Sequence, residues 1–197
     1  MTSFENRLSP DESLSLITNV ILKTKEKINH NSFPLILWGW LIAIASFSFF
    51  FLQNFKVSRF YFIPFPILVI TGIVVTCIWY RKQKNISATE TYLNYFLNRM
   101  WLVLGFCFIT VVFINVAHGS VPFTYTLILA AIGTLASGLT IDFKPLIIGG
   151  ILFLCAAIIT SYLPDVYKAL VHGVAIVGGY IIPGYLLKNH DAHVREI

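Results

Sequence analysis

Six long apolar stretches, nearly free of charged side chains, constrain this chain more than any other feature. They are Phe33–Leu52, Phe60–Tyr80, Met100–Val116, Val121–Leu139, Pro145–Tyr162 and Tyr167–Leu187. No Asp, Glu, Lys or Arg lies inside the first five, and Lys168 lies in the opening turn of the sixth, where its side chain reaches the interface. A helix needs about 20 apolar residues to cross a bilayer. The sequence therefore predicts an all-α integral membrane protein with a bundle of six transmembrane helices.

The composition excludes the main alternatives. Charged residues make up 12% of the 197 residues, whereas a soluble domain carries about 25%, so too little polar surface remains to cover a globule in water. Nucleic-acid binding and disorder are excluded on the same ground, although the net charge is +5. Residues 35–51 show no alternation of apolar and polar residues, as the strands of an outer-membrane barrel would.

The placement of Lys and Arg predicts the orientation in the membrane. If the N-terminus is inside, 11 of the 14 basic residues fall on the inner side and 3 in outer loops. The inner set is Arg7, Lys23, Lys25, Lys27, Arg81, Lys82, Lys84, Arg99, Lys144, Lys188 and Arg195. Cytoplasmic loops carry the excess of basic residues. We therefore expect both ends of the chain in the cytoplasm and the protein in a plasma (inner) membrane.

The chain divides into residues 1–32, a six-helix domain over residues 33–187 and a cytoplasmic tail over residues 188–197. A capping pattern at Ser9-Pro10-Asp11-Glu12 begins an amphipathic helix in the first segment. Its apolar stripe fits a helix on the inner membrane surface, and a helix docked on cytoplasmic loops fits equally well. A second capping pattern, Ser87-Ala88-Thr89-Glu90, starts the third spanning helix below the membrane.

Small residues spaced by four predict close helix packing in the second half of the chain. The pairs are Gly133 and Ser137, Ala169 and Gly173, and Ala175 and Gly179. Such pairs let helix backbones approach closely in lipid. We interpret them as a tight core of the fourth to sixth spans, with an oligomer face or a substrate path as alternatives.

Proline positions predict one irregular helix. Pro183-Gly184 interrupts the sixth span near its inner end, where a proline removes a hydrogen bond and should kink the helix. The segments Ser32-Phe33-Pro34 and Ser120-Val121-Pro122 open the first and fourth spans alike, a faint inverted repeat of the kind found in transporters.

Few ionisable side chains are available for chemistry. His118, Asp165 and His172 all lie towards the outer face and would form a proton-linked or metal site if they met. No ligand spacing joins them, so ordinary interfacial hydrogen bonds are the alternative. His190-Asp191-Ala192-His193 is interpreted as a solvated tail rather than a metal clamp.

The remaining polar and aromatic residues have structural explanations. Cys77, Cys107 and Cys155 sit in apolar runs without a paired spacing and are interpreted as small buried residues. The tryptophans fall towards the inner side and indicate an interfacial belt: Trp38, Trp40, Trp79 and Trp101. No catalytic constellation, cofactor motif or metal-ligand spacing is found, so we expect no cofactor.

Three phrases carry a resemblance over most of the chain. They run from Asn31 to Trp40, from Phe143 to Gly150 and from Ile182 to Lys188. They resemble a group of small, uncharacterised bacterial multi-span membrane proteins. The resemblance implies a bacterial plasma membrane and supplies no catalytic residues.

The sequence leaves two functions open. A non-enzymatic sensor, regulatory or assembly module accounts for the absence of intramembrane charge and for the tight helices. A small transporter or channel accounts for Pro183-Gly184, the threonines of the spans and the faint repeat. The expected partners are the lipid bilayer and, as alternatives, a second copy of the chain or another membrane or cytoplasmic protein. A solid bundle would favour the module, and a polar cavity at the midplane would favour transport.

Overall fold

A computed structural model describes residues 32–55, 62–84 and 92–195; the side chains of residues 83, 84, 92, 94 and 190–195 lie outside the description. The described ranges fold into helices without a strand. The helices are α2 (Ser32–Asn54), α3 (Pro64–Lys84), α4 (Tyr92–Ala117), α5 (Phe123–Thr140), α6 (Lys144–Tyr162), α7 (Asp165–Ile176), a π-helical turn η2 (Val177–Ile181) and α8 (Ile182–Arg195). The amphipathic helix expected after Ser9 and the expected start of the third spanning helix at Ser87 fall on residues outside the description.

Six helical segments in the described ranges are long and apolar enough to cross a membrane, with α7, η2 and α8 counting as one continuous segment. The apolar pattern therefore predicts the spans correctly, and it errs at their ends. The second helix begins at Pro64 rather than at Phe60. The third is described from Tyr92, well before its apolar run, which agrees with the expectation of a start below the membrane. The last helix continues through the expected tail to Arg195.

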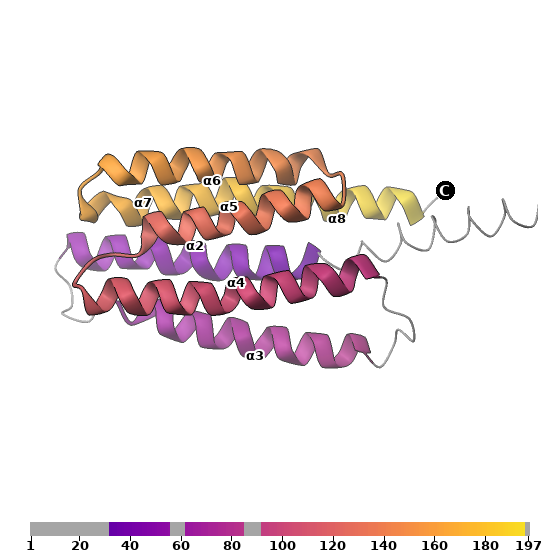
Figure 1. The fold of residues 1–197 in the computed structure, drawn as a ribbon, viewed down its shortest axis with the longest axis horizontal. Coiled ribbons are helices and arrows are strands. Elements are labelled where there is room, and N and C mark those ends of the chain that lie inside the picture. The colour runs from indigo at the N-terminus through magenta and orange to yellow at the C-terminus, as the bar shows by residue number, and fades with distance from the viewer. Residues whose placement is uncertain (1–31, 56–61, 85–91, 196–197) are drawn as a thin grey trace, which may run out of the picture.

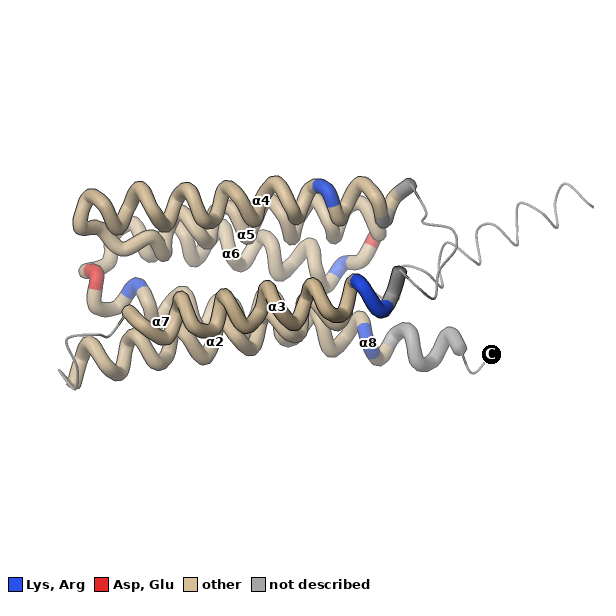
Figure 2. Tube along the Cα trace, turned by 90° about the horizontal axis from the view of Figure 1, so that it is seen from below, with Lys and Arg blue, Asp and Glu red and all other residues tan. Residues whose placement is uncertain are grey.

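The helices lie side by side as a bundle whose long axis is shared by all of them (Figure 1). We name its two ends after a residue in a turn. The Gly119 end holds the turns between α4 and α5 and between α6 and α7, and the Asp142 end holds the turn between α5 and α6. Figure 2 shows charged residues only towards these two ends, with uncharged residues between them over the described part of the chain.

Local chemistry explains the two tight turns. At the end of α4, Gly119 has φ 69°, Gly119 N–H donates to Val116 O at 3.0 Å and Ser120 N–H donates to Asn115 O at 2.9 Å. This is the Schellman arrangement, in which a residue in the left-handed region caps the last carbonyls. After α5, Asp142 takes the same role with φ 51°, a conformation that Asp tolerates better than most residues.

The helices divide into a packed core and a pair at its edge. The core contains α2, α5, α6 and the α7–α8 segment, and its fully buried large side chains include Leu127, Phe153 and Ile176. In the best apolar window of each helix, 44% of the α5 residues and 56% of the α7–α8 residues are buried. The figure is 6% for both α3 and α4. These two helices are therefore attached to the core along narrow seams.

Candidate functional site

A buried histidine ties three helices of the core together near the Gly119 end. His172 of α7 is 4% exposed. Its Nδ1 lies 2.8 Å from Ser46 Oγ of α2, and its Nε2 lies 3.2 Å from Thr126 Oγ1 of α5. We call these three residues the His172 cluster. It joins residues that are 126 and 46 positions apart in the sequence.

Each hydroxyl of the cluster also has a carbonyl partner on its own helix. Ser46 Oγ donates to Ile42 O at 2.7 Å, and Thr126 Oγ1 donates to Phe123 O at 2.9 Å. A hydroxyl has one hydrogen, and a neutral imidazole has one N–H and one acceptor nitrogen. One hydroxyl therefore accepts from the ring N–H, while the other turns its hydrogen from the carbonyl to the ring. Both tautomers are satisfied by this exchange without moving a heavy atom.

The Ser46–His172 contact has the geometry of a hydroxyl beside a base, but its surroundings do not suit catalysis. Ser46 is 0% exposed and His172 is 4% exposed, so a substrate has no access to the hydroxyl. Phe123 packs against the imidazole with ring centroids 5.2 Å apart. The arrangement can clamp α2, α5 and α7 in one register, and it provides no nucleophile to an outside molecule.

The other two residues of the expected outer site lie elsewhere. His118 is exposed after the end of α4, and its Nδ1 bonds to Ile114 O at 2.8 Å. Asp165 pairs with Lys168 at 2.7 Å. Seven residues of helix place Asp165 about 10 Å along the axis from His172, which is why the carboxylate does not reach the ring. Among the described residues, no group of three or more His, Cys, Asp or Glu is placed to hold a metal ion.

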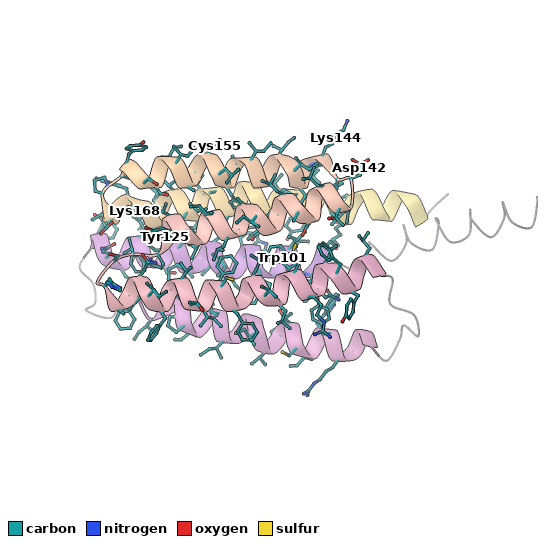
Figure 3. The ribbon with its side chains drawn as sticks, viewed as in Figure 1. Trp101, Tyr125, Asp142, Lys144, Cys155 and Lys168 are labelled. Atoms are coloured by element: carbon teal, nitrogen blue, oxygen red, sulfur yellow. The ribbon has the colours of Figure 1, made fainter. Side chains whose placement is uncertain are left out.

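A second polar group lies deeper in the core. Tyr180 of η2 lies beside Thr134 of α5, whose hydroxyl donates to Ala130 O at 2.6 Å, and its ring centroid lies 6.4 Å from that of Trp101. Trp101 Nε1 of α4 donates to Ser137 Oγ of α5 at 3.0 Å. We call Trp101, Thr134, Ser137 and Tyr180 the Trp101 cluster. Trp101, labelled in Figure 3, was expected in an interfacial belt, whereas its indole N–H bonds into the bundle.

The π-helical turn lies directly before Pro183. Ile182 N–H bonds to Val177 O, five residues back. Pro183 has no N–H for Gly179 O, its acceptor in a regular α-helix. That carbonyl lies against α6, and a Cβ added at Gly149 would stand 2.7 Å from it. The irregularity associated with Pro183-Gly184 thus occupies Val177–Ile181, where the backbones of η2 and α6 approach closely.

The glycines expected at helix contacts lie against neighbouring helices. A Cβ at Gly133 would meet Leu104 and Trp101, one at Gly173 would meet Phe47 and one at Gly179 would meet the Phe153 ring. Ser137 receives the Trp101 hydrogen bond. The cysteines differ from expectation, because Cys77 and Cys155 are exposed on α3 and α6. An apolar thiol gains nothing from burial when lipid surrounds the helix.

Sequence reasoning missed Ser46, Thr126 and Tyr180. Ser46 and Thr126 could have been found from their position along the spans, because they lie towards the same end of the bundle as His172. Ser46 lies eight residues before the end of α2, and Thr126 and His172 lie three and seven residues after the starts of α5 and α7.

Comparisons with known protein families, with curated proteins and with solved structures find no match to this chain.

Proposed function

We propose that this protein is a non-enzymatic module of a bacterial inner membrane, acting in regulation, sensing or assembly, with both ends in the cytoplasm. The observation that carries the proposal is the filled core. Leu127, Phe153 and Ile176 are each at most 2% exposed in the middle of the bundle. The Gly149–Gly179 contact closes the space between α6 and η2. In the part of the chain that the structure describes, this close packing supports a solid bundle rather than a transport path.

The proposed sidedness rests on charge. Over the described side chains, Arg81, Lys82, Arg99, Lys144 and Lys188 lie towards the Asp142 end, with Asp142 as the acidic residue there. The Gly119 end carries Asp165 and Lys168, which pair with one another. An excess of basic residues marks the cytoplasmic side, so the Asp142 end faces the cytoplasm.

The experiment is cysteine accessibility in cells. In a chain with Cys77, Cys107 and Cys155 replaced by Ser, single cysteines are introduced at Ala131 and Phe153, halfway along α5 and α6. We expect no reaction with a membrane-impermeant maleimide from either side. A cysteine at exposed Lys188 is the control and should react only after the cytoplasm is opened. Reaction at Ala131→Cys or Phe153→Cys in intact cells would contradict the module.

The alternative is a small transporter or channel, and one observation favours it. The π-helical turn and the Trp101 cluster lie in the interior of the bundle, and π-helical turns occur frequently at functional sites. Under this alternative the buried hydroxyls line a path that opens in a second conformation. The same cysteines would then react in a time-dependent manner, and their reaction would be slowed by the transported solute.

A further inference from the structure

A shallow pocket opens at the Gly119 end, where α4 meets α5. It has a volume of about 270 Å³ and is lined by Val111, Ile114, Asn115, His118 and Tyr125. Four of these residues come from the last two turns of α4 and the residue after it, and Tyr125 comes from the first turn of α5. Figure 3 shows Tyr125 near the turn that joins the two helices. The pocket lies outside both buried clusters.

Two hydrogen bonds determine which polar atoms of the lining residues are left to accept. His118 Nδ1 lies 2.8 Å from Ile114 O, and a carbonyl can only accept, so Nδ1 carries the hydrogen. In the neutral ring Nε2 is then an acceptor. Asn115 Nδ2 donates to Val111 O at 2.8 Å, which leaves Oδ1 as the acceptor of that amide. The end of α4 thus holds two preset acceptors.

The lining is mostly apolar, and its two acceptors select a hydrogen-bond donor with positive charge. Asn115 lies in the last turn of α4, His118 is the residue after that helix, and both line the pocket, so a small group bound there has both residues as neighbours. Tyr125 adds an aromatic ring, which attracts cations, and a hydroxyl. None of the five lining residues is charged, so the pocket supplies no cation for a phosphate. A primary ammonium, with its three N–H donors, fits this set.

The position of the pocket identifies the source of that ammonium. His118 follows directly after the last residue of an apolar helix long enough to cross a bilayer, so the pocket lies at head-group depth. We propose that the pocket of Asn115, His118 and Tyr125 binds the ammonium group of an ethanolamine phospholipid. The inference does not depend on whether the protein is a module or a transporter, and it holds whichever end faces the cytoplasm.

The test compares lipids with the same acyl chains by native mass spectrometry of the purified full chain. Phosphatidylethanolamine should bind at least tenfold more tightly than phosphatidylcholine, because choline has no N–H to donate. His118→Phe keeps an aromatic ring and removes the acceptor, and Asn115→Leu removes the other. Each should weaken phosphatidylethanolamine binding about tenfold, the loss of one hydrogen bond to a charged group. Tyr162→Phe, at an 87% exposed position, is the matched control and should change nothing.

Magnetic resonance of ¹⁵N-labelled histidine gives a second readout in lipid vesicles. The Nε2 signal assigned by its loss in His118→Phe should shift on changing phosphatidylcholine to phosphatidylethanolamine, and the His172 signals should not. Equal binding of the two lipids, or a phosphatidylethanolamine preference that survives both substitutions, would overturn the proposal. A preference for phosphatidylglycerol would show that the pocket binds hydroxyl donors rather than an ammonium group, and it would also overturn the proposal. Displacement of the lipid by free ethanolamine would show a soluble amine to be the ligand and would equally overturn it.

Discussion

The four-helix core and the α3–α4 pair are equally apolar and differ in how they are held. The best apolar window of α4 has a mean hydropathy of 2.4 and that of α6 has 2.1, yet the buried shares are 6% and 39%. In the core, Gly138 and Gly149 lie against the backbones of neighbouring segments. On α4, a Cβ added at Gly105 would meet no atom of another helix within 4 Å. Glycine thus brings two backbones together in the core, whereas in the α3–α4 pair Gly105 faces open space and Gly72 lies against the side chains of Leu41 and Trp38.

The difference is the one expected of helices that lie in a bilayer. In water an apolar side chain gains by burial, whereas beside lipid tails it gains only from better packing and hydrogen bonding. Residues that pack closely therefore determine which helices form the core. The peripheral pair uses large side chains at its seams instead, as where Trp38 Nε1 of α2 donates to Thr76 Oγ1 of α3 at 3.2 Å.

The largest expected effect on the free energy of unfolding is seen on comparing two phenylalanines, one in the core and one in the peripheral pair. Phe153 is 0% exposed in α6, and Phe113 is 74% exposed on α4. Phe153→Ala should lower the free energy of unfolding by about 3 kcal/mol or more, because it leaves a cavity that the core cannot fill. Phe113→Ala should change it by less than about 0.5 kcal/mol. Reversible unfolding in mixed detergent micelles measures both, and equal effects would mean that α4 is packed as closely as α6.

The next effect compares two glycines. A Cβ at Gly149 would stand 2.7 Å from Gly179 O and 3.1 Å from Gly179 Cα, so Gly149→Ala must push α6 away from η2. We expect a loss of about 1–3 kcal/mol in the same unfolding assay. Gly105→Ala has open space and should be neutral or stabilising by up to about 1 kcal/mol, through helix propensity. A Gly149→Ala protein as stable as the unchanged protein would show that the close contact between α6 and η2 does not stabilise the fold.

A smaller effect tests the His172 cluster. Ser46→Ala removes the partner of His172 Nδ1 and leaves a buried ring nitrogen without its bond. We expect a loss of about 1–2 kcal/mol, at the upper end of polar contacts between transmembrane helices. Ser161→Ala is the control, since that exposed serine bonds only to Ala157 O of its own helix at 2.9 Å. A loss no larger than that of the control would refute the role of the cluster as a clamp.

The smallest effect concerns the seam between core and periphery. Thr76→Val keeps the shape of the side chain and removes the acceptor of Trp38 Nε1. The expected loss is about 0.6 kcal/mol, the average for such a bond in a membrane. Thr71→Val removes only a bond to Ile67 O within α3 and should leave the free energy of unfolding unchanged. Trp38 fluorescence should shift in the first variant and stay unchanged in the second.

The spans were predictable because crossing a bilayer requires a length and a hydropathy that single segments either have or lack. Which face of each helix is buried was not predictable from hydropathy. Ile158 is 63% exposed and Ile176 is 2% exposed, and the two residues are chemically identical. The glycine and serine spacings predicted contact faces without naming the partner. That Gly149 meets Gly179, or that Trp101 meets Ser137, depends on how the helices are arranged in space.

The candidate site was less predictable for a related reason. His172 was recognised as an ionisable residue inside an apolar span, but its partners were sought among other ionisable residues. Over the described residues, the ring nitrogens of His172 pair with hydroxyls instead. Transmembrane helices tolerate threonine and serine almost anywhere, because these side chains bond to the carbonyls of their own helix. Thr110 does so on the surface of α4 at 2.9 Å. Hydroxyls with a role in the core and hydroxyls without one therefore look alike in the sequence.

The wide turn at Val177–Ile181 has a consequence for everything that follows it. It accommodates one more residue than a regular α-turn, so each residue of α8 is rotated by about 100° from where an uninterrupted helix would place it. Leu187, now 3% exposed, and Tyr185, whose hydroxyl accepts from Trp40 Nε1 at 3.3 Å, owe their facing to that rotation. The turn thus changes which side of the helix each residue of α8 faces, relative to the residues of α7. Deleting Gly178 should convert the wide turn into a regular α-turn and leave the residues of α8 facing as they do now, whereas a deletion within α8 would misalign the residues after it.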